Sequence, residues 1–253
     1  MVKIMNTFMD FTITTILWTY YIAGFILVFS PFYLFSFFRR DKKEAGFQKL
    51  NHIFFNSFFS LLRILVPRVT WRVSDEVRAI RSSVIIANHL SFLDPILFVS
   101  LFPRQKTVVK KDYFRVPVFG WILKTSGYIP AFTGDSGAEI LLEQVERMKA
   151  YLAEGGNLFM FPEGTRSRDG RIGSFDRGAF RIAKFCDVPI RVLVIRNTGR
   201  LYPPGRILFN TCERFTISVE AGGTLMPDYK EETISLSAVM AEARKLMEER
   251  TNP

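Results

Sequence analysis

One histidine and one aspartate follow a short apolar run in a pattern that could form a general base. The run, Val84–Ala87, is typical of a buried strand, and four polar residues come after it: Asn88, His89, Ser91 and Asp94. Asp94 lies five positions after His89, a spacing that suits neither one helix face nor one strand face, but does suit a turn that folds the carboxylate back onto the imidazole. Asp94 would then accept one ring N–H and leave the other nitrogen of His89 open to a proton. A capping or core role for the two residues is the alternative.

A second polar group follows another apolar run. Residues Asn157–Phe161 indicate a strand, and Pro162 ends it just before four residues that could bind substrate: Glu163, Gly164, Thr165 and Arg166. Gly164 permits an unusual backbone angle, and the guanidinium of Arg166 has the planar shape that binds phosphate. Chemistry in α/β proteins is common at the ends of strands, so both groups are candidates for one site.

Together, NHLSFLDP at residues 88–95 and FPEGTRS at residues 161–167 resemble the two most diagnostic blocks of the glycerolipid acyltransferases of the PlsC type. This family includes the 1-acylglycerol-3-phosphate (lysophosphatidic acid) acyltransferases. The order and separation of the blocks also resemble the family. Three further segments are similar to its other blocks, namely 110–121, 175–179 and 188–194.

The resemblance implies an O-acyltransferase that moves a fatty acyl group from an acyl thioester to the free hydroxyl of a lysolipid. His89 would take the hydroxyl proton and return it to the departing thiolate, while Asp94 orients the imidazole. The substrate-binding residues would be Glu163, Gly164, Thr165 and Arg166, with Arg166 holding an acidic headgroup. Glu163 could position the acceptor, hold Arg166, or form only a salt bridge within its loop. The expected co-substrate is acyl-CoA or an acyl carrier protein thioester, with no metal, no separate cofactor and no covalent acyl-enzyme.

One residue that the resemblance leads us to expect is missing. The family usually has an arginine for the acceptor's phosphate after a glycine and an apolar pair, whereas Gly127–Pro130 is followed here by Ala131, Phe132 and Thr133. The cations that could replace it are Lys110, Lys111 and Arg177. The leading acceptor is 1-acyl-glycerol-3-phosphate, which would give phosphatidic acid in phospholipid biosynthesis, and the alternative is another lysophospholipid or a lyso-aminolipid. A catalytically silent membrane-binding homologue is the alternative from another class, and the intact histidine–aspartate pair argues against it.

The composition favours a membrane over the other partners of a basic protein. The net charge of +10 and the isoelectric point near 9.7 suit an anionic partner. Phenylalanine is frequent, 26 of 253 residues, and most of the N-terminal ones lie in a single apolar stretch. No basic-aromatic module of nucleic-acid-binding proteins appears, so we expect a lipid bilayer and no nucleic acid as partner. Cys186 and Cys212 are too few and too far apart for a zinc site or a disulfide framework, which fits a reducing, cytosol-facing catalytic domain.

An N-terminal segment is expected to place the chemistry at the membrane. Residues 11–38 carry no charged side chain and exceed the roughly 20 apolar residues of a spanning helix. Pro31 should end or kink this helix, which leaves residues 11–29 as the cleanest candidate span. The run is too long for a cleavable signal peptide. The cations within residues 39–43 outnumber the one upstream lysine, which predicts that the catalytic domain lies on the cytoplasmic face.

A second N-terminal helix is predicted over residues 45–66, where apolar residues recur at helical spacing opposite a polar side that includes His52. Such a helix could lie in the membrane interface, or it could pack on the soluble domain. Because it could also pair with the first helix, a re-entrant segment is an alternative to a spanning one. We therefore divide the chain into membrane-anchoring helices at residues 1–66 and an acyltransferase domain at residues 67–253.

Alternating strand and helix patterns predict the scaffold that positions these groups. Strands are expected at 69–73, 83–88, 107–110, 128–131, 157–161 and 190–195, with two more near 206–220. Helices are expected at 92–101, 117–125, 137–153, 177–185 and 231–249, with a surface loop at 198–205. Interleaved strands and helices predict an α/β fold with a mixed sheet flanked by helices, preceded by a membrane-embedded helical segment.

Overall fold

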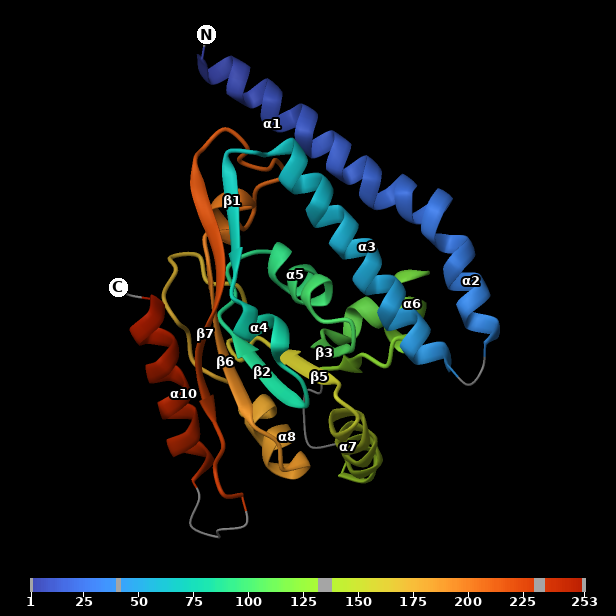
Figure 1. Ribbon diagram of the computed structural model, residues 1–253, viewed down its shortest axis with the longest axis vertical. Coiled ribbons are helices and arrows are strands. Elements are labelled where there is room, and N and C mark those ends of the chain that lie inside the picture. The colour runs from blue at the N-terminus through green and yellow to red at the C-terminus, as the bar shows by residue number, and fades with distance from the viewer. Residues whose placement is uncertain (1, 40–41, 132–137, 230–234, 252–253) are drawn as a thin grey trace. The chain divides into compact units, whose positions relative to one another are not determined.

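The structure is a computed structural model that describes residues 2–39, 42–131, 138–229 and 235–251 (Figure 1). The chain divides into two compact units. Unit 1 comprises residues 1–73, 90–103 and 195–219, and unit 2 comprises residues 74–89, 104–194 and 220–253. The division of the chain at residue 66 stays a prediction.

A mixed α/β sheet forms the centre of the fold, and helices flank it, as the sequence predicts. Among the described residues the strand order is β1-β7-β6-β2-β5-β3-β4. The strands are β1 (Val69–Val73), β2 (Ser83–Ala87), β3 (Gln105–Val109), β4 (Ile129–Pro130), β5 (Asn157–Met160), β6 (Ile190–Arg196) and β7 (Phe215–Leu225). The strands β2 to β5 belong to unit 2 and β1 to unit 1, while β6 and β7 pass from one unit to the other.

Parallel pairing in unit 2 sets the edge at which the polar motifs lie. β2 pairs in parallel with β5 and with β6, and its residue Ile86 lies opposite Met160 and Val192. β3 pairs in parallel with β5 and with β4. Since the carboxyl ends of parallel strands meet at one edge of a sheet, the residues after β2, β3, β4 and β5 share that edge.

The core of unit 2 explains why these strands form. Every residue of β2 is buried. Side chains along a strand alternate between its two faces, so the β-branched residues Val84 and Ile86 lie on the same face. That face packs against α8 (Gly178–Cys186), whose Phe180 and Ala183 are fully buried. α7 (Ala138–Ala153) and α10 (Leu236–Thr251) complete this cluster (Figure 1). Unit 2 also contains α4 (Asp75–Ala79), the 3₁₀ helix η3 (Lys111–Arg115) and α6 (Phe119–Thr125).

The N-terminal helix of unit 1 is longer than predicted. It consists of α1 (Val2–Thr19), a π-helical stretch η1 (Tyr20–Phe29) and α2 (Ser30–Phe38). Pro31 therefore does not end the helix, although the helix changes direction between α1 and α2 (Figure 1). Proline has no N–H and its ring clashes with the carbonyl four residues back in an α-helix, so the wider π turns ahead of Pro31 let the helix continue. Residues Lys3–Phe38 are long and apolar enough to cross a membrane by length and composition.

The amphipathic helix is α3 (Lys43–Leu65), and its apolar side packs within unit 1. Phe54 and Phe58 are buried, and Phe54 stacks on Tyr20 of η1. α3 also packs against α5 (Leu93–Leu101). The imidazole Nδ1 of His52 lies 3.2 Å from the carbonyl of Val99 in α5. This packing agrees with the alternative of a helix that packs on the rest of the protein, and a position in the membrane interface stays a prediction.

The largest error of the strand prediction lies at residues 206–220, where two strands were expected. The structure has one strand there, β7, and a short helix α9 (Thr198–Leu201) in place of part of the expected loop. The N–H of Phe209 donates to Thr14 Oγ1 at 2.9 Å, and the N–H of Thr211 donates to Asp10 Oδ1 at 2.8 Å. Because side chains of α1 bind these backbone groups, the segment needs no strand partner.

Candidate active site

His89 lies two residues beyond β2 and is held at three points within unit 2. Its ring stacks on the ring of Phe161, with the centroids 4.3 Å apart and the planes 21° from parallel. Its backbone N–H donates to Glu163 Oε1 at 3.0 Å, and its carbonyl accepts the N–H of Ser167 at 2.7 Å. The parallel register of β2 and β5 brings the two segments together. The structure therefore joins His89 to the segment Phe161–Ser167.

Glu163 bonds with both of its carboxylate oxygens to backbone groups outside its own turn. Its Oε1 accepts the N–H of His89, and its Oε2 accepts the N–H of Gly173 at 2.8 Å. Within the described residues Glu163 makes no ion pair with Arg166, so its carboxylate holds the backbone rather than the neighbouring guanidinium. A Cβ atom on Gly173 would lie 3.2 Å from Glu163 Oε2, which makes glycine the residue that best allows this approach.

A tight turn presents the remaining predicted binding residues to solvent. The N–H of Gly164 donates to the carbonyl of Phe161 at 3.0 Å, and Gly164 has a φ of +65°, in the left-handed region that favours glycine. Gly164, Thr165 and Arg166 are exposed. In the described part of the chain no hydrogen bond or ion pair engages the Arg166 side chain. Its guanidinium can therefore meet an anionic ligand without first breaking a protein contact.

The loop after Arg166 is fixed by its own acidic residue. Asp169 Oδ1 accepts the N–H of Arg171 at 3.1 Å and the hydroxyl of Ser167 at 3.1 Å. These two bonds, the Arg171 N–H first, hold the pKa of the Asp169 carboxyl below its usual range. Since the Ser167 N–H also binds the His89 carbonyl, the turn is bonded to His89 from both sides of Arg166.

Asp94 belongs to unit 1, where it is fully buried in the first turn of α5. Its Oδ2 accepts the N–H of Leu90 at 2.6 Å and the N–H of Ser91 at 2.7 Å. The turn thus folds the carboxylate back onto the residues that follow His89. Ser91 is a turn residue, whose hydroxyl donates to the carbonyl of Tyr202 at 2.8 Å. The pairing of Asp94 with the His89 imidazole stays a prediction from their spacing.

The cations that could replace the missing arginine are exposed. Lys110 and Lys111 follow β3 at the same edge of the sheet as His89, and Lys110 Nζ pairs with Asp112 at 3.0 Å. Arg177 precedes α8 and is also exposed. Of the positions where an arginine was sought, Ala131 is described, and its N–H extends the pairing of β4 with β3 by donating to Val109 at 2.8 Å. Phe132 and Thr133 lie outside the described residues.

Metal ligands and cysteines are the other side chains that could carry chemistry in the described part of the chain. No group of three or more His, Cys, Asp and Glu residues lies close enough there to hold a metal ion. Cys186 and Cys212 are free thiols. Burial raises the pKa of the Cys186 thiol to about 11, so this side chain is not a thiolate nucleophile at neutral pH.

The sequence did not reveal the residues that support His89 and Glu163 without belonging to the predicted site. Phe161 was identified as part of a strand and of the FPEGTRS block but given no role, and its ring supports His89. Gly173 and Arg244 were not singled out, although they bind Glu163 and the loop around Gly173. The glycine could have been noticed as a position of close approach. Nothing in the local sequence of Arg244 distinguishes it from the other cations of its helix.

The comparisons with known proteins agree on one family. The model of the family described as Acyltransferase matches residues 68–196. The 1-acyl-sn-glycerol-3-phosphate acyltransferase BAT2 of Brassica napus is 37% identical over 122 residues, which are 48% of this chain and 35% of that protein. The 1-acyl-sn-glycerol-3-phosphate acyltransferase of Saccharomyces cerevisiae is 30% identical over 158 residues, which are 60% of this chain and 51% of that protein. The chain thus spans only a third to a half of the length of these curated relatives.

A solved structure has the same fold. The crystal structure of the 1-acyl-sn-glycerophosphate (LPA) acyltransferase PlsC from Thermotoga maritima superimposes with a TM-score of 0.68 at 22% identity, over 100% of both chains.

Proposed function

This chain belongs to the Acyltransferase family, and on that premise we propose that it transfers a fatty acyl group from an acyl thioester to the free hydroxyl of a lysolipid. The leading acceptor is 1-acyl-glycerol-3-phosphate, and the product would be phosphatidic acid. The observation that carries the proposal is the direct bonding of His89 to the segment that presents Arg166. These bonds hold a proton acceptor, His89, close in the structure to the turn that carries an anion-binding group, Arg166. The names of the curated relatives support the same acceptor.

His89 would act as the general base. Its imidazole takes the proton of the acceptor hydroxyl while the oxygen attacks the thioester carbonyl. The C–S bond then breaks, and the imidazolium returns the proton to the departing thiolate, so no covalent acyl-enzyme forms. The stack on Phe161 and the two backbone bonds fix the ring plane and the backbone of His89 before substrate binds. Such positioning supplies much of the acceleration in this mechanism.

Asp94 would orient His89 and stabilise the imidazolium. Its Oδ2 is already fixed by the N–H groups of Leu90 and Ser91, so the carboxylate has one defined position in the turn. A carboxylate with that role acts through the tautomer of the imidazole, leaving the acceptor-facing nitrogen unprotonated.

Substrate binding would start at Arg166. Its exposed guanidinium can form two parallel bonds with a phosphate. Gly164 and Thr165 shape the turn, while Glu163 fixes its start rather than contacting Arg166. A phosphomonoester carries nearly two charges, so a second cation is expected, and Lys110, Lys111 and Arg177 are the candidates. A lysolipid with another headgroup would need only Arg166 and is the alternative acceptor.

The lipid substrates imply contact with a bilayer. Apolar side chains are exposed along the helix Lys3–Phe38, among them Phe8, Ile22, Leu27 and Phe35. Cations follow at residues 39–43, which would hold the catalytic domain on the cytoplasmic face. Fractionation tests this part: the full chain should need detergent to leave the membrane fraction. Recovery of the full chain in a detergent-free supernatant would contradict it.

A transfer assay tests the activity. The purified full chain is incubated with labelled acyl-CoA, or with labelled acyl carrier protein, and with a panel of lysolipids. We expect labelled phosphatidic acid from lysophosphatidic acid, at a rate above that for zwitterionic or neutral lysolipids. A preferred acceptor without a phosphomonoester would replace the leading acceptor with the alternative. Failure of every thioester and every lysolipid would leave a silent membrane-binding homologue and contradict the proposal.

A further inference from the structure

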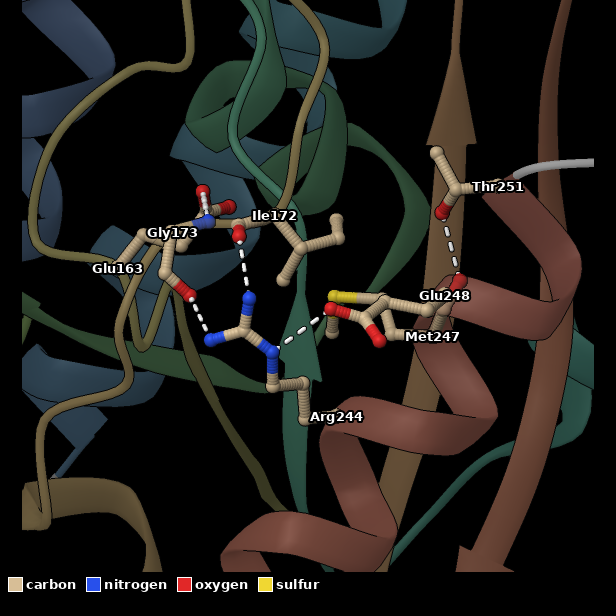
Figure 2. Close-up of polar contacts among 7 residues, drawn as sticks. All are labelled: Glu163, Ile172, Gly173, Arg244, Met247, Glu248 and Thr251. Carbon is tan, nitrogen blue, oxygen red and sulfur yellow. Dashed lines mark hydrogen bonds and ion pairs between the residues drawn. The ribbon is translucent and has the colours of Figure 1, made fainter.

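Behind the candidate site, one arginine of the C-terminal helix reaches the loop between β5 and α8. Arg244 lies on α10, outside the stretch that the family model matches. Figure 2 shows its guanidinium between Glu248 and the backbone of Ile172 and Gly173. Nη2 donates to the carbonyl of Ile172 at 2.9 Å, and Nη1 donates to the carbonyl of Gly173 at 3.0 Å. Nε pairs with Glu248 Oε1 at 2.7 Å, so all three nitrogen atoms of the guanidinium have partners.

The peptide group between Ile172 and Gly173 connects this arginine to Glu163. Its carbonyl accepts from Arg244, and its N–H donates to Glu163 Oε2 at 2.8 Å (Figure 2). A single peptide plane therefore lies between a guanidinium and a carboxylate. Each partner polarises the peptide in the direction that strengthens the other bond. The other oxygen of Glu163 accepts the N–H of His89 at 3.0 Å, so the connection runs from α10 to the histidine.

The loop has few other means of holding this peptide in place. Residues 161–177 contain no helix or strand. The side chain of Ile172 is buried in the core of unit 2, which fixes the position of the loop but not the rotation of the peptide plane. The bond from Arg244 to the Ile172 carbonyl sets that rotation, and its bond to the Gly173 carbonyl sets the next peptide plane, because both carbonyls must face the planar guanidinium.

We propose that Arg244 is a positioning residue for the acyl transfer: it orients the Ile172–Gly173 peptide, which holds Glu163, which in turn holds the backbone of His89. This inference rests on the proposed function. We assign Arg244 no contact with substrate, because its Nε, Nη1 and Nη2 atoms all bond to the protein. Its effect should fall mainly on kcat, because the series of bonds ends at His89. The turn that presents Arg166 is also held by the Gly164–Phe161 bond and by the Ser167–His89 bond, neither of which involves Arg244.

The test compares Arg244→Gln and Arg244→Lys with Lys245→Gln. Lys245 is a matched control, because it is the next residue of α10, is exposed and forms an i,i+4 pair with Glu249 at 3.9 Å. A displacement of about 1 Å at a catalytic group can cost up to about 100-fold in rate, so Arg244→Gln should lower kcat by about 10- to 100-fold. The KM for the lysolipid should change by less than about threefold, as expected when binding is retained. Arg244→Lys should recover part of kcat, since an ammonium can reach one of the two carbonyls.

A double mutant separates positioning from general destabilisation. If Arg244 acts through Glu163, the Glu163→Gln/Arg244→Gln protein should have a kcat within about twofold of Glu163→Gln alone, because residues in one network are not additive. A purely structural role predicts that the two losses multiply. A kcat for Arg244→Gln equal to that of Lys245→Gln, or multiplied losses in the double mutant, would overturn the proposal.

Amide hydrogen exchange gives a readout that does not depend on activity. The N–H groups of His89 and Gly173 should exchange faster in Arg244→Gln than in Lys245→Gln, while the amides of the buried strand β2 should not change. Unchanged exchange at both amides would contradict the positional claim even if the enzyme is active. If the wild-type chain transfers no acyl group at all, the proposed function fails, and the exchange experiment still decides whether Arg244 holds the loop.

Discussion

Replacing Glu163 by glutamine is the substitution whose effect the structure determines most sharply. The change keeps the shape of the side chain but turns one carboxylate oxygen into an NH2 group. Both oxygens accept a backbone N–H, from His89 at 3.0 Å and from Gly173 at 2.8 Å. Whichever way the amide is turned, one of these N–H groups must face another donor. Glu163→Gln therefore loses at least one of the two bonds.

The size of the effect follows from the charge of the acceptor. A hydrogen bond to a charged group contributes about 1.5–3 kcal/mol, so the free energy of unfolding should fall by about 2 kcal/mol. In a chain of this length each kcal/mol shifts the Tm by about 2–4 °C, which gives a fall of about 4–8 °C. The kcat of acyl transfer should fall by up to about 100-fold, because the loss of either bond weakens the connection through Glu163 that holds the backbone of His89.

The matched control is Glu154→Gln, a change of the same chemistry in the same unit. Glu154 is exposed and pairs with Arg104 at 2.9 Å, and such surface pairs contribute only about 0–1 kcal/mol. Tm by circular dichroism and kcat with saturating acyl donor are measured for both variants. A Glu163→Gln protein with the Tm and kcat of the control would refute the reasoning that this carboxylate joins the two motifs.

Three further outcomes are expected. Gly164→Ala should lower the free energy of unfolding by about 1–2 kcal/mol in denaturant titrations, because the φ of +65° at this position is unfavourable for alanine. No atom lies near enough to the added methyl group to cause a further clash. An unchanged denaturation midpoint would contradict the left-handed conformation of Gly164 in the turn. Arg166→Ala should raise the KM for lysophosphatidic acid far more than it changes kcat, whereas an unaltered KM would remove Arg166 from phosphate binding. Between pH 9 and about pH 11 the unfolded chain loses the Cys186 proton before the folded chain does, so the free energy of unfolding should fall with rising pH. Cys186→Ser should make that fall less steep. An equally steep fall in the variant would contradict the raised pKa of the Cys186 thiol.

The strands that position the site could be predicted because their apolar sequences indicate that they are buried. The apolar, β-branched run Val84–Ala87 is typical of a buried strand rather than of a surface segment. Pro162 then marks the end of β5. The parallel sheet then brings the residues after β2 and β5 to one edge, as expected for an α/β fold. Element types and the fold class therefore followed from local pattern.

Contacts between distant residues could not be predicted in the same way. Glu163 binds the N–H of a residue 74 positions earlier, and any nearby acidic residue has the same local signature. The segment around Phe209 has the composition of a strand, but its backbone N–H groups donate to side chains of α1. The helix continues through Pro31 because π-helical turns precede it, a change of geometry that no residue pattern announces. In each case a long-range or cooperative interaction decides between locally equivalent outcomes.

The central claim is that His89 is the general base of an acyl transfer, and the rate of the His89→Ala protein tests it most directly. The backbone bonds of His89 to Glu163 and Ser167 remain in this variant, so the fold should persist and the Tm should stay close to that of the wild type. The transfer of labelled acyl groups to lysophosphatidic acid should fall by about 100- to 10,000-fold, the usual contribution of general-base catalysis. A purified, folded His89→Ala protein that transfers acyl groups at nearly the wild-type rate would contradict the account.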